Sequence, residues 1–308
     1  MIELETVATG LQFPEGPIAL ADGSVLVVEI KRGTLTRISP EGELTVVAQC
    51  GGGPNGAAIG PDGAVYICNN GGFEWSVVDG FLLAHGTPAD YSGGRIQRVD
   101  LETGDVEELY TECEGRALRG PNDLVFDADG GFYFTDHGKG NSRDMDLGFV
   151  YYARPDGSSI TCVASGMHGP NGVGLSPDGT KLYVSETTTG FVWWWDVKGP
   201  GALSGGQTFA GSGGGNFFFS WPDYAIFDSL GVDAAGNVCV ATLLKSGITV
   251  VSPGGELVDF IANVDDPGTT NICWGGEDMS TAYITSSCTG RLLKATWPTP
   301  GLRLNFNA

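Results

Sequence analysis

Residues 120–136 read GPNDLVFDADGGFYFTD, and this stretch decides the fold. Two short apolar runs flank an aspartate-glycine turn, which is the pattern of a β-hairpin. The same pattern recurs from residue 13 (FPEGPIALADGSVLVVE), residue 53 (GPNGAAIGPDGAVYICN) and residue 169 (GPNGVGLSPDGTKLYVSE), with weaker copies beginning at Asp228 and Asn271. Six copies of one hairpin indicate a repeat architecture.

A polar residue occupies the same register in every copy, and we call this position the slot. The six slots are Glu15, Asn55, Asn122, Asn171, Asp228 and Asn271. Their spacing of roughly 40 to 70 residues is close to the 40 to 50 residues of a four-stranded propeller blade. The sequence therefore predicts an all-β protein, a six-bladed β-propeller with a central channel, formed by residues 1–308 as a single domain.

Closure of such a ring requires a strand that completes the last blade. Residues 3–8 (ELETVA) have the pattern of that strand, and pairing it beside the C-terminal strands would cover an exposed edge. Two stretches exceed the repeat, residues 71–93 and residues 211–227. Because long structured insertions are commonly functional, we expect both to form loops over the propeller mouth.

The charge balance excludes several classes of partner. The 308 residues contain 16 Lys and Arg against 37 Asp and Glu, a net charge of −21, which repels nucleic acid and anionic membrane surfaces. No apolar run approaches the length of a membrane span, and no signal peptide pattern opens the chain. The seven cysteines are scattered singly, which favours reduced thiols and a cytoplasmic location.

The slots carry the chemistry that the sequence predicts. Equivalent residues of the innermost strands face one another across a propeller channel, so the slots bring carboxylate and amide oxygens together. Such donors suit a hard cation, and two buried carboxylates require a counterion. An alternative interpretation is that P-N-G and P-N-D are simple turn tripeptides. That alternative explains Glu15 and Asp228 poorly, because Glu is not a favoured turn residue.

Other catalytic signatures are scarce. The three histidines do not form an H-E-x-x-H motif, and the G-x-S-x-G motif of serine hydrolases is missing. A G-x-G-x-x-G match at Gly51, Gly53 and Gly56 precedes a strand pattern where nucleotide binding needs a helix. The tryptophans at 193–195 lie in a strand pattern and are expected to be packing residues.

The quoted segments resemble the senescence marker protein/gluconolactonase (regucalcin-like) family over nearly the whole chain. The resemblance implies a six-bladed propeller that holds one divalent cation and hydrolyses a sugar lactone. It maps the metal ligands onto Glu15, Asn171 and Asp228 and places Asn122 near metal and substrate. The resemblance gives Asn55 and Asn271 no ligand role.

The chain also departs from the family pattern. Family members often carry a basic residue shortly before the Asn122 slot, and here both Arg116 and Arg119 are candidates. His137 follows F-T-D where close relatives often have proline. These positions leave the identity of the lactone open.

The predicted function is metal-dependent hydrolysis of a lactone, with a small-molecule lactone as partner and one divalent ion (Ca, Mg, Mn or Zn) as cofactor. Asp228 is the predicted proton acceptor for the attacking water, and Asn122 is predicted to orient the carbonyl or the water. Two alternatives stay open at this stage. One is a propeller arylesterase or phosphotriesterase, which would need an apolar mouth and is supported by Trp75, Phe81 and the aromatic residues of 217–221. The other is a non-catalytic propeller whose channel is plugged by a metal ion.

Overall fold

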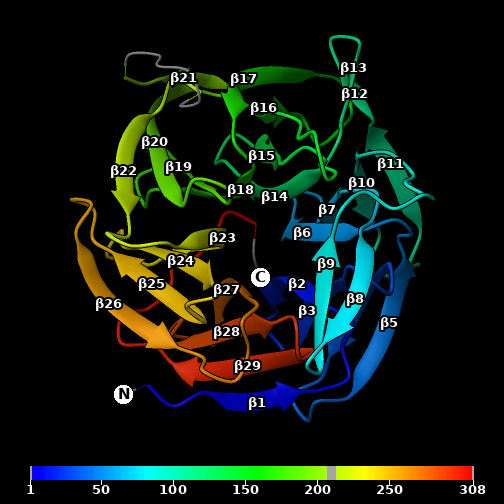
Figure 1. Cartoon of the computed structure of the whole chain (residues 1–308), viewed down its shortest axis with the longest axis vertical. Coiled ribbons are helices and arrows are strands. Elements are labelled where there is room, and N and C mark those ends of the chain that lie inside the picture. Colours follow the sequence, from blue (N-terminus) through cyan, green and yellow to red (C-terminus); the bar gives the residue numbers. More distant parts are fainter. Residues whose placement is uncertain (1, 207–212, 307–308) are drawn as a thin grey trace.

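The computed structural model describes residues 2–206 and 213–306. All helical or extended secondary structure within these residues consists of β-strands. Six sheets form the blades of a ring, which confirms the predicted six-bladed β-propeller (Figure 1). From the inside outward, the first three blades are β2 (Pro14–Ala19), β3 (Val25–Glu29), β4 (Thr34–Ile38) and β5 (Leu44–Gln49); β6 (Pro54–Ile59), β7 (Val65–Asn69), β10 (Arg95–Val99) and β11 (Val106–Tyr110); and β14 (Pro121–Phe126), β15 (Phe132–Asp136), β16 (Gly148–Ala153) and β17 (Ile160–Met167).

The fourth blade has an additional strand beside its third. The last three blades are β18 (Pro170–Leu175), β19 (Lys181–Glu186) and β20 (Phe191–Gly199) with β21 (Ala202–Ser204) and β22 (Asn216–Ser220); β23 (Ile226–Val232), β24 (Val238–Leu243), β25 (Gly247–Val251) and β26 (Leu257–Ala262); and β27 (Thr269–Gly275), β28 (Thr281–Ser286), β29 (Arg291–Thr296) and β1 (Glu5–Ala8). The six inner strands contact one another in sequence around the axis.

The sixth blade is closed as predicted. β1 lies antiparallel to β29, with Glu5 opposite Lys294, so the first strand of the chain covers the last sheet edge (Figure 1). Buried apolar side chains fill the spaces between neighbouring blades, as where Tyr66 of blade 2 packs edge to face against Phe126 of blade 3. The interlocked blades thus hold the inner strands in fixed positions around the channel.

The insertion at residues 71–93 crosses the mouth face, as expected, but as a regular hairpin of β8 (Glu74–Val78) and β9 (Phe81–His85). It leaves blade 2 and reaches over blade 1 to blade 6, where Leu82 N donates to Cys288 O at 2.9 Å (Figure 1). Trp75 packs edge to face against Phe13, at 5.2 Å between ring centroids. The hairpin is therefore anchored at both of its sides.

The expectation of a second mouth loop is wrong for residues 216–220, while residues 211 and 212 lie outside the described part of the chain. Residues 216–220 form β22, which pairs with β20 at the outside of blade 4. Phe217 packs there against Phe191 and Trp193, the first of the three consecutive tryptophans. The physical reason is that β20 leaves half of its edge free of β21, and the aromatic run pairs with that edge. These aromatic residues therefore do not line the mouth.

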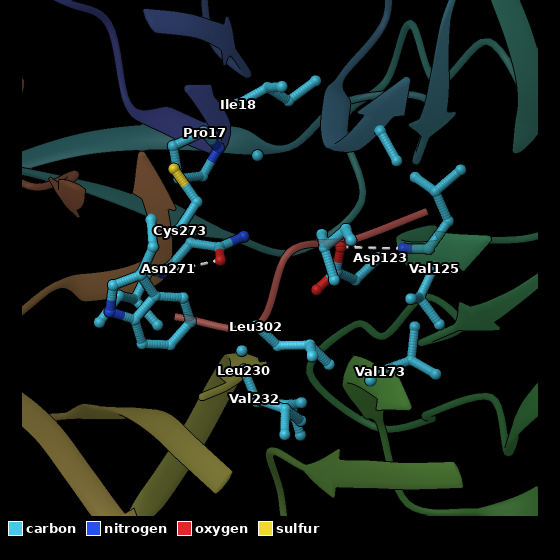
Figure 2. Close-up of a pocket in the computed structure, with 18 of the residues that line it drawn as sticks. Pro17, Ile18, Asp123, Val125, Val173, Leu230, Val232, Asn271, Cys273 and Leu302 are labelled. Atoms are coloured by element: carbon cyan, nitrogen blue, oxygen red, sulfur yellow. Dashed lines mark hydrogen bonds between the residues drawn. The ribbon is translucent and has the colours of Figure 1, made fainter. Parts of the chain in front are cut away.

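The end of the channel opposite the mouth is crossed by the C-terminal segment (Figure 1). Leu302 N donates to Val232 O of blade 5, and Asn305 Nδ2 donates to Phe126 O of blade 3. Between this segment and the slots lies a small cavity of about 70 Å³ lined largely by apolar side chains such as Val125 and Val173 (Figure 2). The inner strands thus surround a channel that is polar near the mouth and apolar below it.

Candidate metal centre

Bulges at the start of the inner strands position the slot residues. Regular pairing is interrupted between Glu15 and Ile18, between Pro121 and Leu124, and at the corresponding place in every other blade. A bulge bends the strand and re-aims its side chains. The slots therefore lie at one level of the channel, at its mouth end.

The structure brings the three predicted ligands together from blades 1, 4 and 5. Asn171 hydrogen-bonds the carboxylate of Asp228, and the charge of Glu15 acts directly on Asp228. The Glu15 and Asn171 side chains are buried, at 2% and 5% exposure, whereas Asp228 is partly exposed. Asn171 Nδ2 donates to Thr187 Oγ1 at 3.0 Å, and the Asn171 amide oxygen accepts from Ser229 Oγ at 3.3 Å, so both ends of the amide are held in place.

Ionisation of the Glu15 and Asp228 carboxyl groups is unfavourable at their positions in the channel. Burial raises the pKa of Glu15 to about 7, against hydrogen bonds from Asn271 Nδ2 and Gly16 N. Burial raises the pKa of Asp228 well above its usual range, and the charge of Glu15 raises it further. A bound cation would relieve both penalties by favouring the ionised forms.

Asn122 occupies the same level on β14, and its side chain is 6% exposed. Its Oδ1 atom is buried and has no hydrogen-bond partner among the described residues. A buried unsatisfied acceptor requires an explanation, such as a bound ion or a donor on a ligand. The combination of this orphaned oxygen with two carboxylates and an amide fits a hard divalent cation. Among the described residues, no group of three or more His, Cys, Asp or Glu side chains is arranged to hold a metal ion.

The sixth slot differs from the sequence alignment. Thr269 lies opposite Ser286 and Ile272 opposite Ile284, as Pro121 lies opposite Asp136 and Leu124 opposite Phe134. This register gives the slot to Thr270, which hydrogen-bonds Glu15. Asn271 is displaced by one position, because blade 6 has one more residue before its turn than blade 3 has. Its Nδ2 supports Glu15 at 2.8 Å.

Sequence reasoning missed Asp123. This residue follows a slot directly and is in register with Asn271, and both side chains lie at the channel (Figure 2). Burial raises the pKa of Asp123 to about 8, and the charge of Glu15 contributes. The equivalent residue of the neighbouring blade is Gly56, where a Cβ atom would lie 2.5 Å from Asp123 Cα. The P-N-D tripeptide among P-N-G copies was the available signal.

The basic candidates and His137 lie at different distances from the slots. Arg116 is exposed in the small hairpin of β12 (Glu112–Cys113) and β13 (Arg116–Ala117), beside outer strand β17. Arg119 pairs with Asp146 at 3.0 Å and lies over the Tyr91 ring. His137 follows β15 directly, at the mouth end of the blade. Of the three, His137 is next to a ligand-bearing strand, since its Nε2 atom approaches Gly169.

No helix in the described residues has the length and apolar character needed to span a bilayer.

A family model described as SMP-30/Gluconolactonase/LRE-like region matches residues 13–288. The gluconolactonase of Zymomonas mobilis is 26% identical over 310 residues, covering 92% of this chain and 79% of that protein. The lactonase drp35 of Staphylococcus saprophyticus is 30% identical over 84% of this chain and 72% of its own length. A gluconolactonase structure from Xanthomonas campestris superposes with a TM-score of 0.75 at 23% identity, over 96% of this chain and 90% of that one, which shows the shared fold.

Proposed function

Because the chain belongs to the SMP-30/gluconolactonase/LRE-like family, we propose that it hydrolyses a lactone, with a sugar-acid lactone as the substrate class. The observation that carries the proposal is the convergence of Glu15, Asn171 and Asp228 with the unsatisfied Oδ1 atom of Asn122 at the channel mouth. The relatives named gluconolactonase and lactonase support it.

Glu15, Asn171 and Asp228 would hold one divalent cation, which supplies Lewis acidity when bound. Asp228 is the least buried of the three, which supports the proposal that it accepts the proton of the attacking water. Asn122 orients the water or the ester carbonyl through its amide. The water oxygen bonds to the carbonyl carbon, the bond from that carbon to the ring oxygen breaks, and the ring oxygen takes a proton. The product is an open hydroxy acid.

The decisive experiment is a pH-indicator assay of a lactone panel with protein that has been chelated and then reconstituted with Ca, Mg, Mn or Zn. We expect acid release from at least one lactone, lost on chelation and restored by a divalent ion. Lack of turnover with every metal would leave the non-catalytic propeller as the better function.

One observation favours testing a second substrate class. Trp75 of the β8–β9 hairpin forms an aromatic cluster with Phe13 and Phe73, in edge contact with both phenylalanines. An aryl ester or phosphotriester would find apolar contacts there. Phenyl acetate and paraoxon therefore belong in the same panel, and preference for either over the lactones would favour an arylesterase or phosphotriesterase.

We also propose that the protein works in a reducing compartment, the cytoplasm. All seven cysteines lie in the described residues and are free. Burial raises the pKa of the thiols, as at Cys50, where it reaches about 12. Seven titratable thiols in unfolded, unreduced protein from the native cell would agree with this location, and fewer would contradict it.

A further inference from the structure

A second pocket opens on the mouth face, next to the end of β15. It has a volume of about 580 Å³ and lies between the β8–β9 hairpin and residues 137–145. We call it the side pocket. Its polar lining comes from His85, Thr87, His137, Lys139, Asn141 and Ser142. Both walls are additions to the blade repeat, so the pocket is a feature of this chain's loops and not of the propeller frame.

The two walls are tied to each other by hydrogen bonds. Thr87 Oγ1 donates to Gly140 O at 3.0 Å, joining the end of the hairpin to the opposite wall. Lys139 Nζ donates to Gly72 O at 2.7 Å and to Asn70 Oδ1 at 3.2 Å. The same ammonium lies 4.1 Å from the centroid of the Phe73 ring. Lys139 is therefore occupied by the wall itself and acts as a positioning residue, and the pocket is preorganised.

His137 stands between the side pocket and the candidate metal centre. It lines the pocket, and its Nε2 atom is so close to Gly169 that a Cβ there would lie 2.8 Å away. Gly169 directly precedes β18, the strand that carries Asn171. A ligand atom near His137 is thus next to the strand that supplies a predicted metal ligand.

The chemistry of the lining matches neutral hydroxyl groups. Burial, with a contribution from Lys139, lowers the pKa of His137 to about 4, so its imidazole is neutral near pH 7 and both donates and accepts hydrogen bonds. The lining carboxylate Glu74 has His85 Nδ1 3.6 Å from its Oε2 atom, and the Lys139 ammonium is held by the wall. Hydroxyl, amide and imidazole groups and the Glu74 carboxylate remain for a ligand, and each of them can hydrogen-bond a neutral hydroxyl group.

We propose that the side pocket is a subsite for the hydroxyl-bearing, non-reacting part of the lactone, and that His137 hydrogen-bonds that part. This inference rests on the proposed lactonase function. It makes His137 a specificity-determining residue. The ester group would lie over the slots while the ring hydroxyls reach toward the pocket.

The test compares two lactones with the same six-membered ring, glucono-δ-lactone and unsubstituted δ-valerolactone, on calcium-reconstituted protein. His137→Ala removes a hydrogen bond that only the hydroxylated lactone makes. We expect KM for glucono-δ-lactone to rise on the order of tenfold, as for one lost hydrogen bond, with kcat/KM for δ-valerolactone unchanged. His168→Ala is the matched control, since His168 is outside the side pocket, and it should leave both lactones unaffected.

Equal losses on both lactones, or no loss on either, would overturn the proposal. If His137→Ala does not fold, Asn141→Ala and Ser142→Ala on the exposed loop replace it, and selective loss on glucono-δ-lactone is again the expected result. If the wild type hydrolyses no lactone, the proposed function fails by itself. Calorimetric titration with the stable glucono-δ-lactam then tests whether the side pocket binds the hydroxyl-bearing part of the ligand. Weaker binding by the variant than by the wild type supports the subsite, and equal or undetectable binding overturns it.

Discussion

At the scale of single residues, Glu15 has the clearest role to test. Its carboxylate is 2% exposed and is supported by Asn271 Nδ2 and Gly16 N, so Glu15→Gln keeps the shape and removes the charge. We expect the variant to fold, to bind divalent ions far more weakly and to lose nearly all turnover. Calorimetric metal titration and the lactone assay measure the two effects. Wild-type rates in metal-free Glu15→Gln protein would contradict the ligand role.

Asn122 should separate metal binding from chemistry. If its amide orients the carbonyl or the water without anchoring the ion, Asn122→Ala retains the metal and loses about 10²-fold or more in kcat, the typical effect of one removed oxyanion donor. Elemental analysis together with kcat decides the matter. Native turnover would return Asn122 to a turn role, and a metal-free variant would make it an essential ligand.

The residue scale also shows why one site residue escaped prediction. In a regular strand, Asn122 and Asp123 would point to opposite faces, so only one would face the channel. The bulge between Pro121 and Leu124 changes this alternation, and both residues lie at the channel. The slots Glu15, Asn171 and Asp228 were predictable because each keeps a constant distance to its turn. Asn271 was placed one residue wrong, because the sequence does not reveal the extra residue before the last turn.

At the scale of elements, Lys139 links two loops and gives the β8–β9 hairpin a pH-dependent support. Burial lowers the pKa of Lys139 from 10.5 to about 7, Asp136 opposes this change and Arg119 adds to it. Between these two pH values the unfolded chain holds a proton that the folded chain has released. Stability of the wild type therefore rises with pH in that window, relative to Lys139→Met, by up to about 1.4 kcal/mol per pH unit.

Urea unfolding of both proteins at pH 6 to 10 measures this difference. Lys198→Met is the matched control, because Lys198 is exposed and pairs with Asp196 on the surface. Parallel pH curves for wild type and Lys139→Met would show that the ammonium keeps its ordinary pKa in the folded protein.

Element pairing was predictable where it is local. Each hairpin is fixed by its own turn, so the inner two strands of the first four blades follow from the D-G pattern, and those of the last two follow from its weaker copies. β22 pairs with β20 although β21 lies between these two strands in the sequence, and nothing local in residues 216–220 specifies that partner. The strand therefore looked like a mouth loop.

At the scale of the whole molecule, β1 closes the ring by pairing with β29. Removing residues 1–8 would expose the edge of β29 and the adjoining core. We expect Tm to fall by at least about 5 °C and the variant to associate at high concentration. Differential scanning calorimetry and light scattering measure these effects. Glu5→Ala, which removes one exposed ion pair with Lys294 and keeps the strand, should change Tm little.

The single domain of residues 1–308 stays a prediction, and unfolding tests it. Every blade packs against two neighbours, so we expect the loss of secondary structure and of tryptophan burial to coincide in urea. Circular dichroism and fluorescence follow the two signals. Separate midpoints would indicate that part of the ring unfolds on its own.

The segment from Gly301 to Asn305 braces the ring of blades mechanically. A closed ring of blades flattens more easily than it stretches, and a segment that ties two inner strands together across the channel opposes flattening. The bonds from Leu302 to Val232 and from Asn305 to Phe126 make such a tie between blades 5 and 3, the blades that also carry Asp228 and Asn122. Removing this segment would allow the ring of inner strands to deform from a circle to an oval. The distance between the oxygens of Asp228 and Asn122, which lie at the mouth end of the same two strands, would then vary more. The selectivity of the proposed site for a large or a small ion would fall as a result.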